Sequence, residues 1–521
     1  MRKKILSNLP YLIGVVVILA LFSLRFINLK TLPVFADEAI YIRWSQVMRA
    51  EQTLRFLPLS DGKQPLFMWV VIPFFKLFRD PLVAGRMVSV LSGLGTMVGI
   101  SLLSYLLFKN KKVSLLAAFF YVISPFTFFF DRLSLADSML SMFGIWTFIF
   151  SYLAIRYKRW DLAMLSGFTL GGAWLTKSPA LFFALMIPSL WLFVNWDKTL
   201  KKNFFIFIKI LALWLVTVFI GYGFYNILRL GPNFHLIASR NMDYVYPLNH
   251  FLVSFFDPLK TFLLASARWI VAMGPWPLLI AAILGFIFNY KKHKKAVLVL
   301  LVWFLVPVLI QSEFAKTFTA RYIFFSIPYL IILSSSVVAA KFNKWGNVAI
   351  CGLLSVFVIV SGIFNYYLLT DPAKAKLPRS ERSGYLEEWT AGHGIRETAN
   401  FLIEEQAAHP EEKIVIGTEG YFGTLPDGLQ IYLNRYPEIT AIGVGLTFDT
   451  VPPPLIDAKA FGDRTYLLVN ASRFSGNAAY LGLMKVKEFP KALKPNGTHD
   501  SLLLFEVTNE ALKNKVNLGK P

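Results

Sequence analysis

Acidic and basic side chains stand close to the ends of apolar segments, and their types suit the transfer of a phosphate-activated group. Asp37 and Glu38 follow the first apolar segment, and Asp137 follows the third. Lys63 and Lys177 supply separated positive charges near other segment ends. A carboxylate can accept the proton of an attacking nucleophile, while cations stabilise the charge that grows on a departing phosphate. Together these residues indicate attack by an acceptor on a sugar attached to a phosphate.

Further polar residues in the same short segments are candidates for binding such a substrate. They stand beside the acids and lysines named above, or close to the start of a later apolar segment. These candidate substrate-binding residues are Tyr41, Arg43, Arg132, Arg321 and Tyr322.

Each candidate also has a structural explanation. Carboxylates are favoured in the first turn of a helix, which would account for Asp37 and Asp137, and a cation near a helix end would account for Lys177. Lys63 and Arg321 would then be membrane anchors whose long side chains reach the interface. Charges that face a helical bundle at the membrane boundary are costly unless they are paired or functional. The convergence of both signs on one side of the bundle favours the chemical role.

The composition indicates the class of protein that must position these residues. The chain has 521 residues, with 53 Lys+Arg against 31 Asp+Glu, yet 56% of it is hydrophobic and only 16% is charged. A soluble nucleic-acid-binding protein with this excess of base would be richer in charge, and a disordered chain would be less apolar. The single cysteine, Cys351, excludes a disulfide framework and a thiolate metal cluster. The chain is therefore predicted to be an integral membrane protein.

The charge divides the sequence into two parts near residues 370–372. Residues 370–521 hold 19 acidic and 17 basic residues, whereas residues 1–369 hold 12 acidic and 36 basic residues. We therefore expect a basic transmembrane body over 1–369, which includes an outer loop over 28–83, and a soluble domain over 370–521.

The body is predicted to be a multi-pass α-helical membrane protein with about eleven transmembrane helices, since each apolar run approaches the ~20 residues that a span needs. The runs are 6–24, 84–108, 113–130, 134–155, 161–176, 179–196, 204–228, 266–288, 296–311, 322–340 and 347–369. The segment 63–78 contains Pro65 and Pro73 and is predicted to lie on the membrane surface. No small-residue cleavage site follows the first run, so we expect a retained first span rather than a signal peptide.

Basic residues collect in alternate connections between these runs. The connections are 2–4, 109–112, 156–159, 198–202, 291–295 and 341–344; they hold 18 basic residues, and Asp161 and Asp197 are the only acids beside them. Connections rich in Lys and Arg stay in the cytoplasm. The N-terminus is therefore predicted to be cytoplasmic, and the candidate residues and the C-terminal domain extracytoplasmic.

The C-terminal domain is predicted to be of the α/β class. A helical pattern over 392–408 precedes strand-like runs at 414–416, 440–446, 465–469 and 502–507. The glycines form no phosphate-binding loop, which argues against nucleotide binding. Trp389, Tyr421 and Tyr432 are candidates for binding a carbohydrate or protein acceptor, although core packing is the more common use of such aromatics.

The order of the motifs resembles the family of protein O-mannosyltransferases and bacterial aminoarabinose transferases. The motifs are Asp-Glu at 37–38, Lys-x-Pro-Leu at 63–66, Arg-x4-Asp at 132–137, Thr-Lys-x-Pro at 176–179 and Arg-Tyr at 321–322. The resemblance covers about residues 10–345. It implies a GT-C membrane fold and an enzyme that uses a polyprenyl-phosphate-linked sugar as donor, with no further cofactor.

The resemblance also implies roles for individual residues. Asp37 resembles the catalytic base and Glu38 its support, while Asp137 resembles a second carboxylate near the active site. Lys63 and Lys177 resemble lysines that contact the lipid phosphate. Arg321 and Tyr322 are further candidates for that phosphate.

The sequence departs from the family pattern at several positions. The aminoarabinose branch reads Asp-Glu-x-Arg-Tyr, but here Ile40 replaces that arginine, while Tyr41 is retained. Arg43 is a candidate substitute. Gln64 and Ser178 replace a proline and a glycine. The C-terminal domain lacks the β-trefoil repeats of the eukaryotic enzymes, so the acceptor remains open among a protein, a lipid and an envelope glycan.

Two other functions fit a multi-pass protein less well. A transporter or lipid flippase would place charges within the spans and show an inverted repeat. An oligosaccharyltransferase or polymer ligase would carry an Asp-x-Asp metal motif in an outer loop. The sequence has neither pattern, and His235 and His250 stand too far from other ligands to suggest a metal site.

Overall fold

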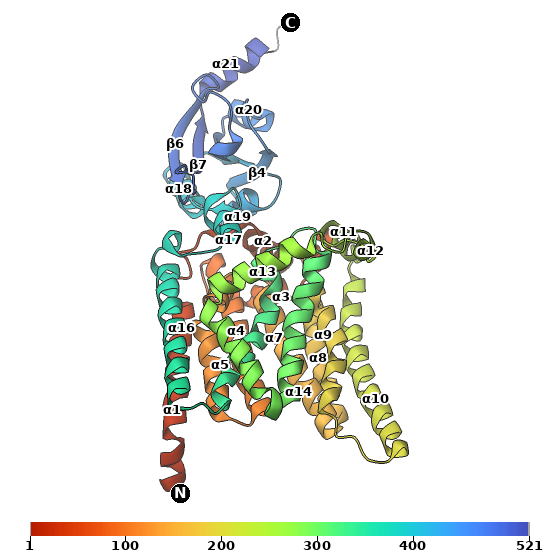
Figure 1. The fold of residues 1–521 in the computed structure, drawn as a ribbon. Coiled ribbons are helices and arrows are strands. Elements are labelled where there is room, and N and C mark those ends of the chain that lie inside the picture. The colour runs from red at the N-terminus through yellow and green to blue at the C-terminus, as the bar shows by residue number, and fades with distance from the viewer. Residues whose placement is uncertain (1, 519–521) are drawn as a thin grey trace.

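The computed structural model describes residues 2–518 and shows a bundle of helices with a sheet-containing domain at one end. In Figure 1 the first helix, α1 (Arg2–Ser23), starts at the far end of the bundle, and the last helix, α21 (Asn509–Leu518), projects beyond the sheet domain. The end of the bundle that carries the sheet domain is called the domain end below, and the other end is called the basic end.

Seven helical segments in the described part of the chain are long and apolar enough to cross a membrane. They correspond to α1 (Arg2–Ser23), α4 (Pro81–Phe108), α7 (Asp137–Tyr157), α10 (Leu200–Tyr225), α14 (Trp276–Phe314), α15 (Ile327–Ser335) with its flanking turns, and α16 (Lys344–Thr370). Shorter apolar helices fill the remaining predicted runs: α5 (Lys111–Ile123), α6 (Pro125–Phe130), α8 (Trp160–Thr176) and α9 (Leu181–Met186). Pro125 begins α6 and so divides the predicted run 113–130, because proline cannot donate a helical hydrogen bond.

Helix α14 corrects the predicted runs 266–288 and 296–311. Residues before Met273 belong to a separate helix, α13 (Leu259–Met273), which contacts Ser380 through Trp269 near the domain end. The backbone of α14 changes direction at His293 (φ −124°, ψ 34°), whose ring lies 5.2 Å from that of Phe108 at the end of α4. Ala315, just after α14, pairs with Val245. The 39 residues of α14 therefore form two passes joined at the basic end.

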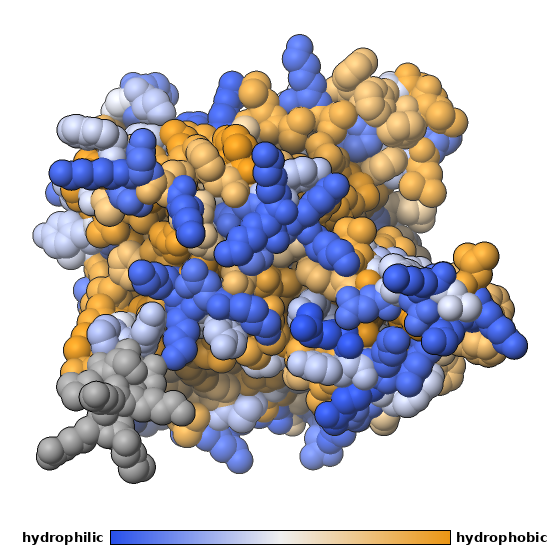
Figure 2. Space-filling view, turned by 60° about the horizontal axis from the view of Figure 1, so that its bottom comes forward, coloured by the Kyte–Doolittle hydropathy of each residue, from blue (hydrophilic) through white to orange (hydrophobic). Residues whose placement is uncertain are grey.

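Hydrophilic side chains gather at the basic end. Figure 2 shows this face as a field of hydrophilic side chains framed by apolar side chains. Residues 109–112 and 291–295 share this end, as the contact between Phe108 and His293 shows. The pattern agrees with a cytoplasmic location for this face, which stays a prediction.

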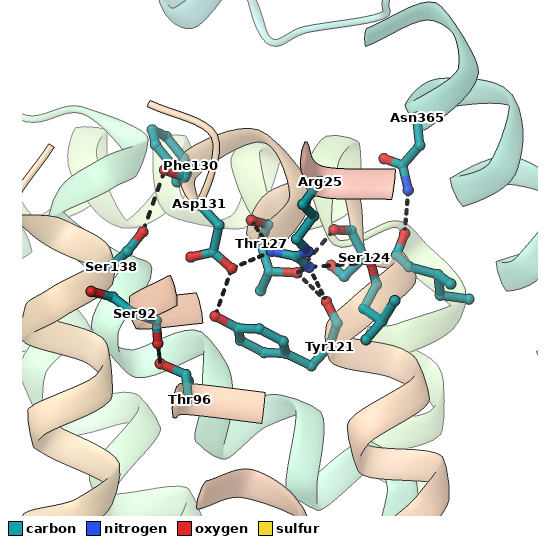
Figure 3. Close-up of polar contacts among 12 residues, drawn as sticks. Arg25, Ser92, Thr96, Tyr121, Ser124, Thr127, Phe130, Asp131, Ser138 and Asn365 are labelled. Atoms are coloured by element: carbon teal, nitrogen blue, oxygen red, sulfur yellow. Dashed lines mark hydrogen bonds and ion pairs between the residues drawn. The ribbon is translucent and has the colours of Figure 1, made fainter. Parts of the chain in front are cut away.

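A buried polar network joins the end of α1 to the turn before α7 (Figure 3). Arg25 forms an ion pair with Asp131 and donates to the carbonyl oxygens of Thr127 at 2.9 Å and Tyr121 at 2.7 Å. The Tyr121 hydroxyl donates to Asp131 at 2.8 Å. Buried charges are tolerated only when they are paired and hydrogen-bonded. This network therefore fixes the turn from which α7 starts.

The C-terminal domain is an α/β fold, as predicted, with a five-stranded sheet in the order β4-β3-β5-β7-β6. Its strands are β3 (Ile414–Glu419), β4 (Ile439–Gly445), β5 (Arg464–Asn470), β6 (Leu483–Pro490) and β7 (Ser501–Val507). β3 runs parallel to β4 and β5, whereas β7 is antiparallel to β5 and β6. The helices α18 (Ile395–Ala408), α19 (Thr424–Leu433) and α20 (Pro453–Ala460) cover it, and α21 (Asn509–Leu518) ends the described chain.

The C-terminal domain packs directly on the helix that carries Asp37. Strand β1 (Val34–Phe35) pairs with β2 (Ala391–Gly392) immediately before α2 (Ala36–Ala50). Gln46 on α2 donates to the carbonyl oxygen of Ile431 on α19 at 2.9 Å. Arg396 on α18 pairs with Asp80 at the start of α4. These contacts hold both ends of the α2 segment against the domain.

Candidate active site

A cavity of about 490 Å³ opens at the domain end of the bundle. Seven of the sequence-predicted residues meet there or pair with a lining residue, although they come from five separate parts of the chain. Its lining includes Asp37, Tyr41, Lys63, Lys177, Arg321 and Tyr322, and Asp137 pairs with one of them. The structure therefore brings together the acids and cations that the sequence placed far apart.

Asp37 lies in the first turn of α2 and is held by two cations. Its Oδ2 lies 2.5 Å from Arg321 Nη1, and its Oδ1 lies 3.5 Å from Lys63 Nζ. Burial would raise the pKa of Asp37, but the nearby charges of Arg321, Lys63 and Lys177 outweigh it and hold the pKa well below its usual range. Asp37 is therefore a carboxylate whenever the protein is folded near neutral pH.

Lys63 bridges two carboxylates in the turn that precedes α3 (Leu66–Leu77). Its Nζ lies 3.2 Å from Asp61 Oδ2 as well as 3.5 Å from Asp37, and it also lies over the rings of Tyr41 and Trp44. Burial lowers the pKa of Lys63, but Tyr41 and the two carboxylates raise it above its usual range. Burial raises the pKa of Tyr41, so its hydroxyl keeps its proton. Lys63 therefore stays positively charged, and its carboxylate partners could be exchanged for another anion.

Lys177 and Asp137 form a further ion pair at this site. Lys177 lies in extended backbone between α8 and the next helical turn, and its Nζ contacts Asp137 Oδ1 at 2.6 Å. The same ammonium lies 5.1 Å from the ring centre of Tyr322. Arg321 lies over the same ring at 5.5 Å, so Tyr322 separates two cations.

Glu38 does not line the cavity, so its predicted support of Asp37 is structural rather than catalytic. Its carboxylate is fully buried and accepts hydrogen bonds from Arg86 at 2.8 and 2.7 Å, from the backbone of Ser134 at 2.6 Å and from the backbone of Phe35 at 3.1 Å. Arg86 also donates to the carbonyl oxygens of Leu32 and Pro33. All of these bonds fix the first turn of α2, so Glu38 positions Asp37 from behind.

Arg132 and Arg43 also lie outside the cavity. Arg132 is buried and donates to the carbonyl oxygens of Ile27 at 2.8 Å and Asn28 at 2.9 Å. Arg43 points to the C-terminal domain and donates to Asn434 at 2.7 Å. Neither guanidinium lines the cavity, and both are engaged by these contacts in the structure.

Other charged and polar residues line the cavity but were not predicted. Asp61 binds Arg240, which lies on α11 (Leu236–Tyr244), with Arg240 Nε 3.1 Å from Asp61 Oδ1. Gln64, Ser178, Asn241 and Gln311 add neutral hydrogen-bonding groups to the lining. Asp61 stands two residues before Lys63 in the sequence, and this closeness could have indicated that Asp61 belongs to the site. The sequence held no such signal for Arg240, because α11 reaches the site only through the tertiary fold.

One wall of the cavity is apolar and exposed to the outside of the bundle. It includes Leu181, Phe182 and Leu185 at α9, and Ile310 and Phe314 at α14. The side chains of Leu181 and Leu185 are 54% and 62% exposed, although they lie on an apolar helix of the membrane body. The cavity thus combines a charged end with a side opening that suits hydrocarbon.

Within the described residues, no group of three or more His, Cys, Asp or Glu side chains is arranged to hold a metal ion. His235 and His250, which the sequence analysis considered, are not among the lining residues, and the His250 ring stacks on Tyr246 at 4.1 Å.

Comparison with a family model gives one match. Residues 62–222 match the dolichyl-phosphate-mannose-protein mannosyltransferase family. The match includes Lys63, Asp137 and Lys177 and begins after Asp37. A comparison with curated protein sequences gave no match.

Solved structures with a similar fold extend over nearly the whole chain. ArnT from Cupriavidus metallidurans, in the apo state, is 16% identical over 97% of this chain and 99% of its own, with a TM-score of 0.54. ArnT bound to undecaprenyl phosphate is 15% identical over the same shares, with a TM-score of 0.55. The oligosaccharyltransferase AglB from Archaeoglobus fulgidus, in complex with an inhibitory peptide and a dolichol-phosphate, is 12% identical over 97% of this chain and 75% of its own, with a TM-score of 0.50. Residues 62–222 are thus similar to the dolichyl-phosphate-mannose-protein mannosyltransferases, and the chain as a whole has the fold of the ArnT structures.

Proposed function

We propose that the protein transfers one sugar from a polyprenyl-phosphate donor to an acceptor on the extracytoplasmic side of the membrane. The observation that carries this proposal is the two-sided character of the cavity. Its charged end holds Lys63, Lys177 and Arg321, and its apolar wall opens beside α9 and α14. A lipid-linked sugar phosphate has the same two parts, an anionic head and a hydrocarbon chain.

The cations would bind the phosphate of the donor. Lys63 and Lys177 both line the cavity, and each has a flexible side chain that pairs with a carboxylate. Arg321 adds a planar guanidinium to the same lining. A phosphodiester entering this end would compete with Asp37 for Lys63 and Arg321. Cations placed where charge develops on the leaving phosphate stabilise the transition state.

Asp37 would then act as the base. The acceptor nucleophile attacks the anomeric carbon of the sugar, the bond from that carbon to the phosphate oxygen breaks, and its electron pair leaves with the phosphate. The acceptor proton passes to Asp37. Because the surrounding cations hold the pKa of Asp37 low, proton transfer would occur late, once the acceptor oxygen has begun to bond. A single displacement of this kind inverts the anomeric centre.

The related proteins agree with this donor class. The ArnT structure holds undecaprenyl phosphate, the AglB structure holds a dolichol-phosphate, and the matched family is named for dolichyl-phosphate-mannose. The acceptor is a protein, a lipid or an envelope glycan. It would approach from the face on which the C-terminal domain, over 370–521, packs against α2. The basic end would face the cytoplasm together with the N-terminus.

The experiment that tests this function uses the full-length protein in proteoliposomes. Polyprenyl-phosphate-linked mannose, glucose and arabinose are supplied in turn, with membrane extract as the source of acceptor, and free polyprenyl phosphate is measured. We expect release that requires the wild-type protein and is lost in Asp37→Asn. Movement of intact donor across the bilayer with no release would instead identify a flippase.

A further inference from the structure

We infer that the sugar transferred is uncharged, and that Gln64, Asn241 and Gln311 bind its hydroxyl groups. This inference rests on the proposed function, since it concerns the donor of the same site. It follows from how the charges of the cavity are already paired, and from which polar groups remain.

Every carboxylate of the cavity is held by a cation. Among the described residues, Asp37 pairs with Arg321 and Lys63, Asp137 pairs with Lys177, and Asp61 pairs with Lys63 and Arg240. An amino sugar would therefore bring its ammonium group to carboxylates that already have cation partners. It would also lie among four cations, which disfavour a fifth.

A negatively charged sugar fits the cavity no better than an amino sugar. The cavity has four cations, namely Lys63, Lys177, Arg240 and Arg321, against the three carboxylates. The single negative charge of a phosphodiester balances this excess. Asp243 also contacts Arg240 at 3.0 Å, but it does not line the cavity and is half exposed, so solvent screens it. A uronic acid would add a second anion with no cation left to bind it.

The polar groups that remain are neutral and suit hydroxyls. Gln64 donates through Nε2 to Ser178 Oγ at 2.8 Å, and Gln311 donates through Nε2 to the carbonyl oxygen of Pro307 at 3.1 Å. Both bonds hold the amide in place, which fixes the side-chain oxygen as an acceptor. Asn241 lines the same cavity from α11. Amides of fixed orientation form specific hydrogen bonds with hydroxyl groups, and a site built for hydroxyls rejects a ligand that lacks them.

The experiment compares neutral and charged donors on the full-length enzyme in proteoliposomes. The neutral donors are polyprenyl-phosphate-linked mannose, glucose and arabinose, and the charged donors carry 4-amino-4-deoxyarabinose and galacturonic acid. We expect the best neutral donor to release polyprenyl phosphate more than about tenfold faster than either charged donor. Equal or faster release from a charged donor overturns the inference and leaves the proposed function standing. No release from any donor contradicts the proposed function itself.

A substitution sharpens the same comparison. Gln311→Glu adds an unpaired carboxylate to the cavity, so the ratio of amino-sugar to neutral-sugar release should rise about tenfold or more. The matched control is Gln52→Glu, an exposed glutamine outside the cavity, which should leave the ratio unchanged. An unchanged ratio in a folded Gln311→Glu protein, or an equal rise in Gln52→Glu, would remove Gln311 from the sugar site.

Discussion

Two groups of charged residues at the domain end of the bundle differ in what binds them. The Arg25–Asp131 and Glu38–Arg86 pairs are fully buried, and backbone groups add further hydrogen bonds to them. The side chains of Asp37, Lys63, Lys177 and Arg321 are 15–24% exposed and are bound mainly to one another. The first group has no room for a ligand, whereas the second lines a cavity in which, under the proposed function, a phosphate would replace a carboxylate. The same residue types therefore build a scaffold in one place and a reactive site in the other.

The largest effect is expected from Asp37→Asn. Loss of the general base should reduce sugar transfer by about 10²–10⁴-fold, because the amide cannot accept the acceptor proton. Donor binding should be retained and the protein should still fold, with a lower melting temperature because Arg321 and Lys63 lose a partner. Transfer is measured as polyprenyl phosphate release, with Asp449→Asn, an exposed residue of the C-terminal domain, as the control. Normal turnover by Asp37→Asn would show that Asp37 is not the base.

Glu38→Gln should act on stability rather than on the reaction. Removing its charge leaves Arg86 buried without a counter-ion, which costs about 3–5 kcal/mol. We expect a clear fall in the melting temperature of the detergent-purified protein. The residual folded fraction should keep its affinity for the donor. Loss of donor affinity with no change in melting temperature would instead place Glu38 in the cavity.

Lys177→Ala should weaken donor use more than it slows the bound reaction. A hydrogen bond to a charged group contributes about 1.5–3 kcal/mol, which corresponds to a rise of more than about tenfold in the donor KM. The matched control is Lys316→Ala, because Lys316 is exposed and donates to the carbonyl oxygen of Met242. An unchanged donor titration would exclude Lys177 from the phosphate site.

The pH dependence of kcat/KM should follow the pKa of Asp37. Because the cations hold that pKa below its usual range, the base stays ionised as the pH falls, and the acid limb should lie below pH ~4. The stabilising contribution of Asp37 is likewise present above its unfolded pKa and is lost only as pH falls through the folded pKa. Lys63→Met removes one cation and should move the acid limb upward. An acid limb near pH 6 in the wild type would contradict this environment.

The smallest effect is expected from Arg43→Ala. It removes one partly exposed hydrogen bond between α2 and the C-terminal domain, at a cost of about 0.5–1.5 kcal/mol. Donor KM should stay within about twofold of wild type, since Arg43 lies outside the cavity. A large rise in donor KM would show that Arg43 contacts the phosphate after all.

The sequence predicted the apolar helices and the polar residues near their ends, because hydrophobic length and local motifs record both. It did not show which charges face each other. Glu38 and Asp37 are adjacent in the chain, yet Glu38 faces Arg86 and Asp37 faces the cavity. Their directions differ because neighbouring residues of the helix α2 point to different sides of it. Likewise, Arg240 reaches Asp61 only because α11 folds back over the loop before Lys63. Strand β6 was missed because its charged, exposed residues at the sheet edge lack an apolar alternation.

The central claim is a single displacement in which Asp37 takes the acceptor proton and the phosphate leaves with the lipid. A single-turnover reaction with radiolabelled donor, followed by determination of the anomeric configuration of the product, tests it most directly. We predict one polyprenyl phosphate released for each sugar transferred, with inversion of the anomeric centre. Retention of configuration, or a sugar bound covalently to the protein, would contradict it.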